Sequence, residues 1–237
     1  NSLYSNSTGN YNVGIGKRAL YTNSTGSQNT SVGANALDNN STADNNTAVG
    51  YASLGTSSTG ASNVAVGAES LGNNTTGFNN VALGYQALLN NTTAAGNVAV
   101  GWKALYSTTT GNSNTAIGRE ALLLNTANGN TALGYRSLYV NTSGTGNVAV
   151  GNSPLVANTT GNYNTVVGSA CGSANTTGSD NVAMGYGAYN QATTGGSNTA
   201  IGRLALYALT TTSNNTAVGR SALQGCTTGG YNVAVGS

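Results

Sequence analysis

Apolar and polar residues recur along this chain with a 17-residue period. Each period begins with Asn, numbered here as position 1, and continues with Val or Thr, a third residue that is usually Ala, a large aliphatic residue and Gly. The consensus is N-[VT]-A-[VIL]-G-x-x-A-L-x-x-N-T-T-G-x-x. Positions 2 to 4 alternate as the two faces of a strand do, so a short strand is predicted in every period. The Asn residues at position 1 are Asn12, Asn29, Asn46, Asn63, Asn80, Asn97, Asn114, Asn130, Asn147, Asn164, Asn181, Asn198, Asn215 and Asn232.

One spacing in this series is a residue short. It lies between Asn114 and Asn130, and the missing residue falls in the polar stretch 125–129. A deletion inside a strand would invert its faces, whereas a surface turn tolerates the loss. We therefore expect residues 125–129 to form a turn.

The period predicts an all-β chain, a parallel β-solenoid (β-roll) of about fourteen 17-residue coils. Such a period is too short for a pair of helices but matches one turn of a narrow solenoid. Positions 2 and 4 share one strand face and position 9 is nearly always Leu, so these three columns are expected to stack as a thin core. The Ala residues at positions 3 and 8 would then form a flat outer face. One coil buries too little to offset its own ordering, so stability is expected from stacking.

The Gly at position 5 recurs in all copies, which predicts a site without room for a Cβ atom. Either φ is positive there or another backbone packs against it. The Asn at position 1 is expected to form a ladder of side-chain amides, and positions 12 to 15 a second turn. Pro154 at position 8 predicts that this position lies at a corner, outside the ladder. The glycines at position 5 are Gly16, Gly33, Gly50, Gly67, Gly84, Gly101, Gly118, Gly134, Gly151, Gly168, Gly185, Gly202, Gly219 and Gly236.

The repeat runs through the whole chain, so one continuous repeat domain over residues 1–237 is predicted. No atypical capping repeat stands at either end, as a self-contained solenoid would need. The first and last residues fall at positions 7 and 6, in register with each other. We expect either a slice of a longer repetitive shaft or a unit that stacks end to end, and favour the slice.

Composition narrows the classes of function. Charged residues make up 5% of the chain, His is absent and the net charge is +2, so the basic field that nucleic-acid binding needs is missing. No apolar run approaches the roughly 18 residues of a membrane span, so no membrane insertion is expected. Cys171 and Cys226 lie three coils apart, beyond disulfide reach, and are interpreted as small residues replacing Ala and Asn.

The chain offers little for catalysis. Its five carboxylates are scattered: Asp38 and Asp44 occupy turns without a basic residue beside them in sequence, and a narrow solenoid is expected to have no cleft. Ser and Thr are abundant, but no His stands ready to activate them. We predict no enzyme, no catalytic residues, no metal site and no cofactor. The five carboxylates are Asp38, Asp44, Glu69, Glu120 and Asp180.

The unit N-[VT]-A-[VIL]-G-x-x-[AS]-L, seen at residues 63–71 and 114–122, resembles the head repeats of trimeric autotransporter adhesins and the repetitive shafts of bacteriophage tail fibres. In those adhesin heads a shorter repeat forms a left-handed parallel β-roll that trimerises. The longer repeat here adds the N-T-T-G turn. The resemblance implies a left-handed solenoid in a trimer, on an extracellular, cell or virion surface.

Two surface features suggest binding, each with an alternative interpretation. Aromatic residues recur at position 6, where they could stack on sugar rings or merely stabilise neighbouring coils. Paired threonines at positions 13 and 14 form a Thr ladder, a possible ice-binding face, although adjacent residues cannot both face outward in an extended segment. Their N-x-[ST] sequons follow from the turn sequence itself and do not indicate glycosylation. The aromatic candidates are Tyr51, Tyr85, Trp102, Tyr135 and Tyr186.

Together these features predict a structural or adhesive fibre segment. It would associate with itself, laterally as a homotrimer or end to end as a filament, and a host-surface glycan or protein would be its other partner. The alternatives are an ice-binding solenoid and a glycan-binding surface.

Overall fold

The computed structural model describes residues 1–237 and contains short strands and turns without a helix. Every strand is three residues long and covers positions 2 to 4 of one repeat. This confirms the predicted all-β parallel β-solenoid. The strands are β1 (Val13–Ile15), β2 (Thr30–Val32), β3 (Thr47–Val49), β4 (Val64–Val66), β5 (Val81–Leu83), β6 (Val98–Val100), β7 (Thr115–Ile117), β8 (Thr131–Leu133), β9 (Val148–Val150), β10 (Thr165–Val167), β11 (Val182–Met184), β12 (Thr199–Ile201), β13 (Thr216–Val218) and β14 (Val233–Val235).

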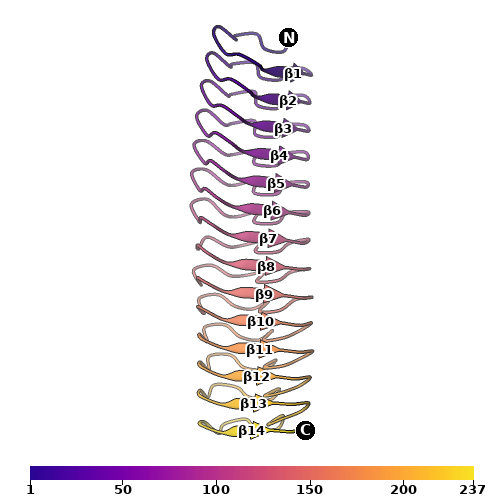
Figure 1. Cartoon of the computed structure of the whole chain (residues 1–237), viewed down its shortest axis with the longest axis vertical. Helices are drawn as coiled ribbons and strands as arrows, with labels where there is room; N and C mark the ends of the chain where they lie inside the picture. Colours follow the sequence, from indigo (N-terminus) through magenta and orange to yellow (C-terminus); the bar gives the residue numbers. More distant parts are fainter. The chain divides into compact units, whose positions relative to one another are not determined.

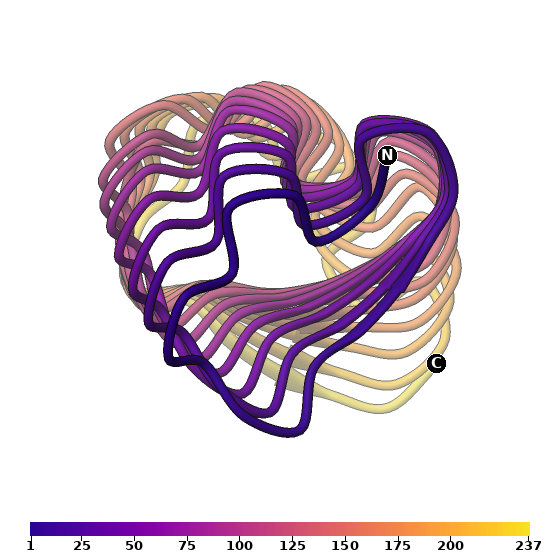
Figure 2. The same cartoon turned by 90° about the horizontal axis from the view of Figure 1, so that it is seen from above.

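The chain divides into two compact units, residues 1–119 and residues 120–237. In the first unit β1 to β7 pair in parallel, each with the next, and in the second unit β8 to β14 do the same. Within each unit the strands follow one another along the same side (Figure 1), and successive turns surround a narrow interior (Figure 2). Equivalent positions lie side by side, as in Val64 beside Val81. One continuous domain over residues 1–237 stays a prediction.

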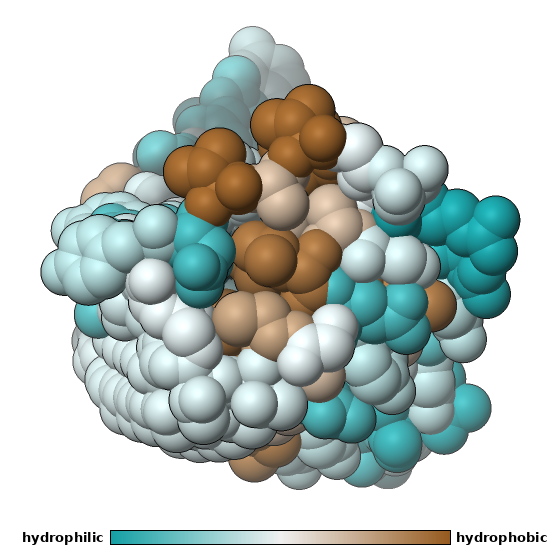
Figure 3. Space-filling model, turned by 90° about the horizontal axis from the view of Figure 1, so that it is seen from below, coloured by the Kyte–Doolittle hydropathy of each residue, from teal (hydrophilic) through white to brown (hydrophobic).

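Small residues and Leu fill the interior of each coil. Ala82 at position 3, Ala87 at position 8 and Leu88 at position 9 are all fully buried. Figure 3 looks onto the coil that carries β14, where apolar residues gather between polar ones. The expected core of positions 2, 4 and 9 is therefore wrong in two of its three columns, and the Ala face expected on the outside lies inside. Position 4 points outward instead, leaving Leu83 37% and Met184 48% exposed.

The narrowness of the coil explains this reversal. The interior of a 17-residue turn has room for Ala at position 3 but not for a column of Val or Ile facing a column of Leu. The coil of β10 shows the limit directly. There Gly172 replaces Leu at position 9, and Val166 replaces Ala at position 3. A Cβ atom on Gly172 would lie 3.7 Å from both Cγ atoms of Val166, so the larger residue occupies the vacated space. The larger residue at position 3 thus offsets part of the volume lost at position 9, as close packing favours.

The predicted ladder at position 1 is confirmed and has a second role. The backbone N–H of Asn80 donates to Asn63 Oδ1 at 3.0 Å, and its side-chain Nδ2 donates to the same oxygen at 3.2 Å. Nδ2 also donates across the coil to the carbonyl oxygen of Ala94 at 2.8 Å. Each position 1 amide therefore joins neighbouring coils and ties the strand to the second turn of its own coil.

Asn at position 12 forms a second buried column, which the sequence interpretation missed because it assigned these residues only to a turn. Asn40 Nδ2 donates to Asn23 Oδ1 in the preceding coil at 2.7 Å and to the Ala43 carbonyl at 3.1 Å. The turn itself is confirmed by the second bond. Where the next coil has another residue at position 12, the Oδ1 atom of the last Asn in the column is buried without a hydrogen-bond partner. These unpaired acceptors belong to Asn40, Asn91 and Asn175, which precede Ser57, Thr108 and Ala192.

Both reasons proposed for Gly at position 5 hold. Gly84 has a φ of +130°, and a Cβ atom there would lie 2.7 Å from the Gly101 carbonyl oxygen of the next coil. The corner at position 8 is also confirmed. Ala87 N–H bonds back to the carbonyl of Gly84 at 3.3 Å, not to a neighbouring coil. Pro154 at this position therefore removes only a long turn hydrogen bond, while its carbonyl still accepts from the N–H of Leu138 at 3.1 Å.

The short copy is accommodated in its turn, as predicted. Asn125 Nδ2 bonds to the carbonyl of Ala127, two residues ahead, whereas Asn141 Nδ2 bonds to Gly144, three residues ahead. Strand β8 follows this turn and stays in register with β9. The deletion thus tightens one turn and leaves the strand faces unchanged.

Candidate binding surfaces

The outer face of the strands is uncharged and largely apolar. It consists of positions 2 and 4, which are Val, Thr, Ile, Leu or Met in every copy. We call this surface the sheet face. Its position 4 column includes Leu83 and Ile117 in the first unit and Leu133, Met184 and Ile201 in the second, all more than a third exposed. Such regular exposure of large apolar side chains is the usual mark of an interaction surface.

The aromatic candidates at position 6 lie beside the sheet face, and all are exposed. Three of their rings are covered by cations. Trp102 lies under Lys103 Nζ (4.7 Å from the ring centroid) and Arg119 Cζ (5.1 Å). The covered tyrosines are Tyr135, with Arg136 Cζ at 5.2 Å, and Tyr186, with Arg203 Cζ at 5.9 Å, and no such cation covers Tyr51 or Tyr85.

These contacts favour the structural interpretation for the covered rings. A cation over an aromatic face stabilises neighbouring positions by about 0.5–1 kcal/mol at exposed sites. It also occupies the face that a sugar would use. Tyr51 and Tyr85 carry no such cation and remain the candidates for stacking.

An ion pair holds one of these cations in the second unit. Arg136 Nε donates to Glu120 Oε2 at 2.5 Å, and the Glu120 side chain is nearly buried. The hydrogen bond to this carboxylate raises the pKa of Arg136 above its ordinary value. The guanidinium also lies 5.0 Å from the ring centroid of Tyr139 at position 10.

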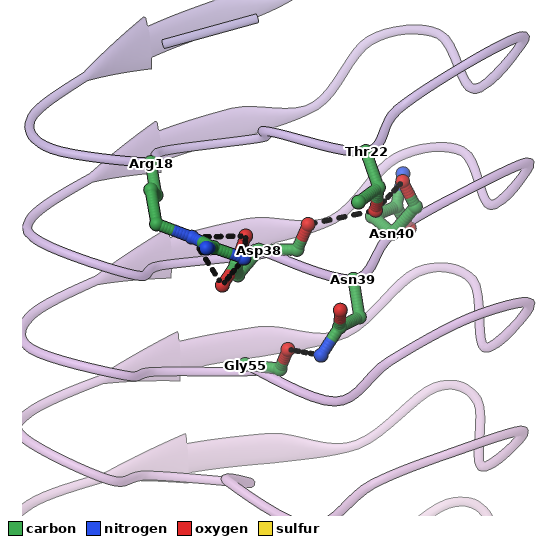
Figure 4. A network of polar contacts seen from close by, with 6 residues as sticks. All are labelled: Arg18, Thr22, Asp38, Asn39, Asn40 and Gly55. Atoms are coloured by element: carbon green, nitrogen blue, oxygen red, sulfur yellow. Dashed lines mark hydrogen bonds and ion pairs between the residues drawn. The ribbon is translucent and has the colours of Figure 1, made fainter. Parts of the chain in front are cut away.

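A polar groove lies on another side of the first unit, at positions 6, 7, 10 and 11, and corrects the expectation of no cleft. Its volume is about 590 Å³. Asp38, expected to have no basic partner, is paired in the groove with Arg18 of the preceding coil. Arg18 Nη2 lies 3.0 Å from Asp38 Oδ2, and Nε donates to both carboxylate oxygens (Figure 4). The groove is lined by Lys17, Arg18, Asn35, Asp38, Ala52, Gly55, Thr56, Glu69, Gly72, Asn73 and Leu89.

The groove exists because two successive coils lack a side chain at position 10. Gly55 and Gly72 occupy this position, which holds Tyr in four other complete coils. The backbone beside them is already bonded: Asn39 Nδ2 donates to the Gly55 carbonyl at 3.0 Å (Figure 4), and Thr56 Oγ1 donates to the Gly72 carbonyl at 2.8 Å. The floor of the groove is therefore fixed backbone. No sequence signal in a single coil marks it, since it depends on several coils together.

The threonine pairs separate into two columns. Hydroxyls at position 13 donate to the position 13 carbonyl of the next coil, as Thr75 Oγ1 does to Thr92 at 2.9 Å. The second threonine of each pair, at position 14, is exposed, as Thr76 and Thr93 are. In most pairs only the position 14 threonine is exposed, whereas both threonines are exposed in the pairs Thr109–Thr110 and Thr227–Thr228.

Eight asparagines of N-x-[ST] sequons lie in the position 12 column. Seven of these eight (Asn23, Asn40, Asn74, Asn91, Asn141, Asn158 and Asn175) are fully buried and Asn6 is exposed, as are Asn45, Asn73 and Asn214 of sequons outside this column. Their Nδ2 atoms are engaged in hydrogen bonds between or within coils. A glycan on a buried amide is incompatible with the folded coil.

Other chemistry is sparse. Both cysteines are free thiols; burial raises the pKa of Cys171 to about 12, and Cys226 Sγ lies 3.6 Å from the Gly229 carbonyl in the place of an Asn amide. The chain brings together no three His, Cys, Asp or Glu side chains that could hold a metal ion. It also contains no helix with the length and hydropathy to cross a membrane.

The chain was compared with family models, curated proteins and solved structures. No family model, no curated protein and no solved structure matches it.

Proposed function

We propose that this chain is a structural segment of a surface fibre and that it associates laterally with copies of itself through the sheet face. The single observation that carries the proposal is the outward direction of position 4. Because large aliphatic side chains project from every coil, burying them against another chain is favourable by roughly 25 cal/mol per Å² of apolar area. No charge at positions 2 or 4 opposes that burial.

The regular spacing of side chains on the sheet face favours a second copy of this chain as its binding partner. Its side chains repeat with the spacing of parallel strands, about 4.8 Å per coil. Another solenoid of the same sequence presents the same spacing, so ridges and hollows can interlock along its length. Closed symmetric association of identical chains is also the common outcome for self-complementary surfaces.

The fibre role and the surface location rest on the resemblance of the repeat to adhesin heads and tail-fibre shafts. Three chains around a common axis would follow that precedent. The Ala columns, expected to form a flat outer face, are interior, so the sheet face is the apolar surface that remains for contact. Only 5% of the residues are charged, which suits a structural role. Stability in such a role comes from the stacking of repeated coils.

Sedimentation equilibrium of the intact chain tests lateral association. We expect a mass that is a multiple of the 23.4 kDa of one chain. Leu83→Lys and Met184→Lys place a charge on the sheet face of each unit and should shift the mass toward the monomer. Thr76→Lys and Thr177→Lys add the same charge at exposed position 14 and serve as controls. A wild-type mass equal to that of one chain at all concentrations would contradict the proposal.

Ice binding is a second candidate, favoured by the exposed threonines of position 14. In the first unit this column runs without interruption through six successive coils that contain Thr25, Thr42, Thr59, Thr76, Thr93 and Thr110. Thermal hysteresis measures the activity. A freezing-point gap that Thr76→Lys abolishes and Met184→Lys preserves would support ice binding, and its absence at millimolar protein would exclude it.

A further inference from the structure

We infer that the polar groove of the first unit binds a neutral saccharide chain. The groove lies apart from positions 2 and 4, so binding here does not depend on lateral association. Its only position 6 residue is Lys17, and none of the position 6 aromatic residues lines it.

The guanidinium of Arg18 is fixed in the groove before any ligand arrives. Asp38 holds it through the ion pair, and the ring of Tyr21 lies 4.7 Å below its Cζ atom. Tyr21 is in turn stacked on Tyr4, with ring centroids 5.1 Å apart and an interplanar angle of 7°. A group fixed in this way loses little conformational entropy on binding.

Several polar groups that line the groove keep unused hydrogen-bonding capacity. Glu69 Oε2 accepts from Gln86 Nε2 at 2.6 Å, which leaves its other oxygen open. The side chains of Lys17 and Asn35 form no hydrogen bond within the chain. Together these groups offer both donors and acceptors, as the hydroxyl groups of a sugar require.

The charge of the groove indicates a neutral ligand. Its two cations, Lys17 and Arg18, are matched by two anions, Asp38 and Glu69, so the lining has no net charge. A phosphate, a sulfated chain or an acidic peptide would meet the carboxylates as repulsive neighbours. A neutral polyhydroxylated chain can bond to both kinds of group.

The glycine floor suits an elongated ligand. Gly55 and Gly72 lie in adjacent coils, so the open strip runs across coils rather than into the interior. Backbone that carries no side chain allows a close approach. Leu89 and Ala52 add apolar surface for the carbon-bound hydrogens of a sugar ring.

An array of neutral and acidic oligosaccharides, followed by calorimetry on the intact chain, tests the assignment. Gly72→Tyr fills the groove with the residue that other coils carry at position 10. A Cβ atom there would meet only the mobile end of Leu89, at 2.8 Å from Cδ1, and backbone at 3.2 Å. We expect neutral hexasaccharides to bind and Gly72→Tyr to weaken binding at least tenfold. Ser173→Tyr makes the same addition at position 10 of the second unit and should leave binding unchanged.

Each other result decides against the assignment. Binding to no oligosaccharide, binding only to sialylated or sulfated chains, or equal binding by wild type and Gly72→Tyr would overturn it. Met184→Lys separates this test from that of the proposed function, because a monomeric chain should still bind through the groove.

Discussion

The hydroxyl of Tyr189 donates a 2.6 Å hydrogen bond to the carbonyl oxygen of Gly195. In other coils this position 15 carbonyl accepts from Asn at position 12, as Gly161 does from Asn158 at 3.1 Å. In the coil of β11, position 12 is Ala192, which has no amide to offer. Tyr189 replaces the usual Leu at position 9 and supplies the missing donor. Tyr189 at position 9 therefore compensates for the loss of Asn at position 12 of the same coil.

This relationship predicts strong coupling between positions 189 and 192. Tyr189→Leu alone leaves a cavity and a lost donor and should lower the free energy of unfolding by about 2–3 kcal/mol. Ala192→Asn alone should destabilise through overpacking against the ring. The double variant restores the consensus and gives Asn175 Oδ1 a partner, so its stability should be within about 0.5 kcal/mol of wild type or higher. Urea unfolding of wild type, the two single variants and the double variant gives the four free energies of this double-mutant cycle. Additive effects of the two substitutions would contradict the coupling.

Alkaline pH should destabilise the second unit between about pH 9 and 12. Burial raises the pKa of Cys171 from 9.0 to about 12 and that of Tyr189 from 10.0 to about 12. In this window the unfolded chain releases these protons and the folded chain keeps them. Stability is therefore full below pH 9 and falls as pH rises, by up to about 1.4 kcal/mol per pH unit for each group.

Cys171→Ala isolates the thiol contribution, because Ala is the usual residue at position 8. Its unfolding free energy should decline less steeply between pH 9 and 10 than that of wild type. Cys226→Ala removes the half-buried cysteine and is the control. Identical pH profiles for wild type and Cys171→Ala would refute the assignment.

A stabilising substitution is predicted at Ser57. Asn40 Oδ1 is buried without a partner beneath it, and Asn at position 57 would supply the donor that other coils provide. We expect Ser57→Asn to raise the free energy of unfolding by about 1–2 kcal/mol. Ser62→Asn makes the same change at exposed position 17, where the repeat accepts Asn, and should change stability by less than about 0.5 kcal/mol. Chemical denaturation compares the two, and equal effects would argue against a buried ladder.

Position 5 should reject any side chain. Gly185 has a φ of +127°, and a Cβ atom there would lie 2.8 Å from the Gly202 carbonyl. Gly185→Ala combines backbone strain with this clash and should cost at least about 2 kcal/mol. Gly225→Ala in the same unit meets no atom within 4 Å and is the matched control. Thermal unfolding by circular dichroism would show the contrast, whereas similar midpoints for both variants would contradict it.

Periodicity in the sequence was enough to predict the solenoid, the coil length and the turn that absorbs the deletion. Those features depend on spacing alone. Gly at position 5 and Asn at position 1 were also interpreted correctly, since each has few physical reasons to recur. Pro154 located a corner because a missing N–H restricts where a residue can lie.

The direction of the strand faces could not be predicted from polarity. Position 4 carries larger aliphatic residues than position 3, and the usual assumption buries the larger. The decisive quantity was the interior volume of a coil, which two Asn columns and one Leu column already occupy. The groove was missed for another reason. Arg18, Asp38 and Glu69 occupy three different coils, and only stacking brings them onto one surface.

Met184 offers the most direct test of lateral association, because it is the only methionine and lies on the sheet face at position 4. Its side chain is 48% exposed in a single chain, so dilute peroxide should oxidise the thioether readily. Peptide mass spectrometry gives the oxidation rate as a function of protein concentration. Lateral association predicts a rate that falls several-fold as concentration rises, and Leu83→Lys should relieve part of this protection. A rate that is the same from nanomolar to high micromolar protein would contradict burial of the sheet face.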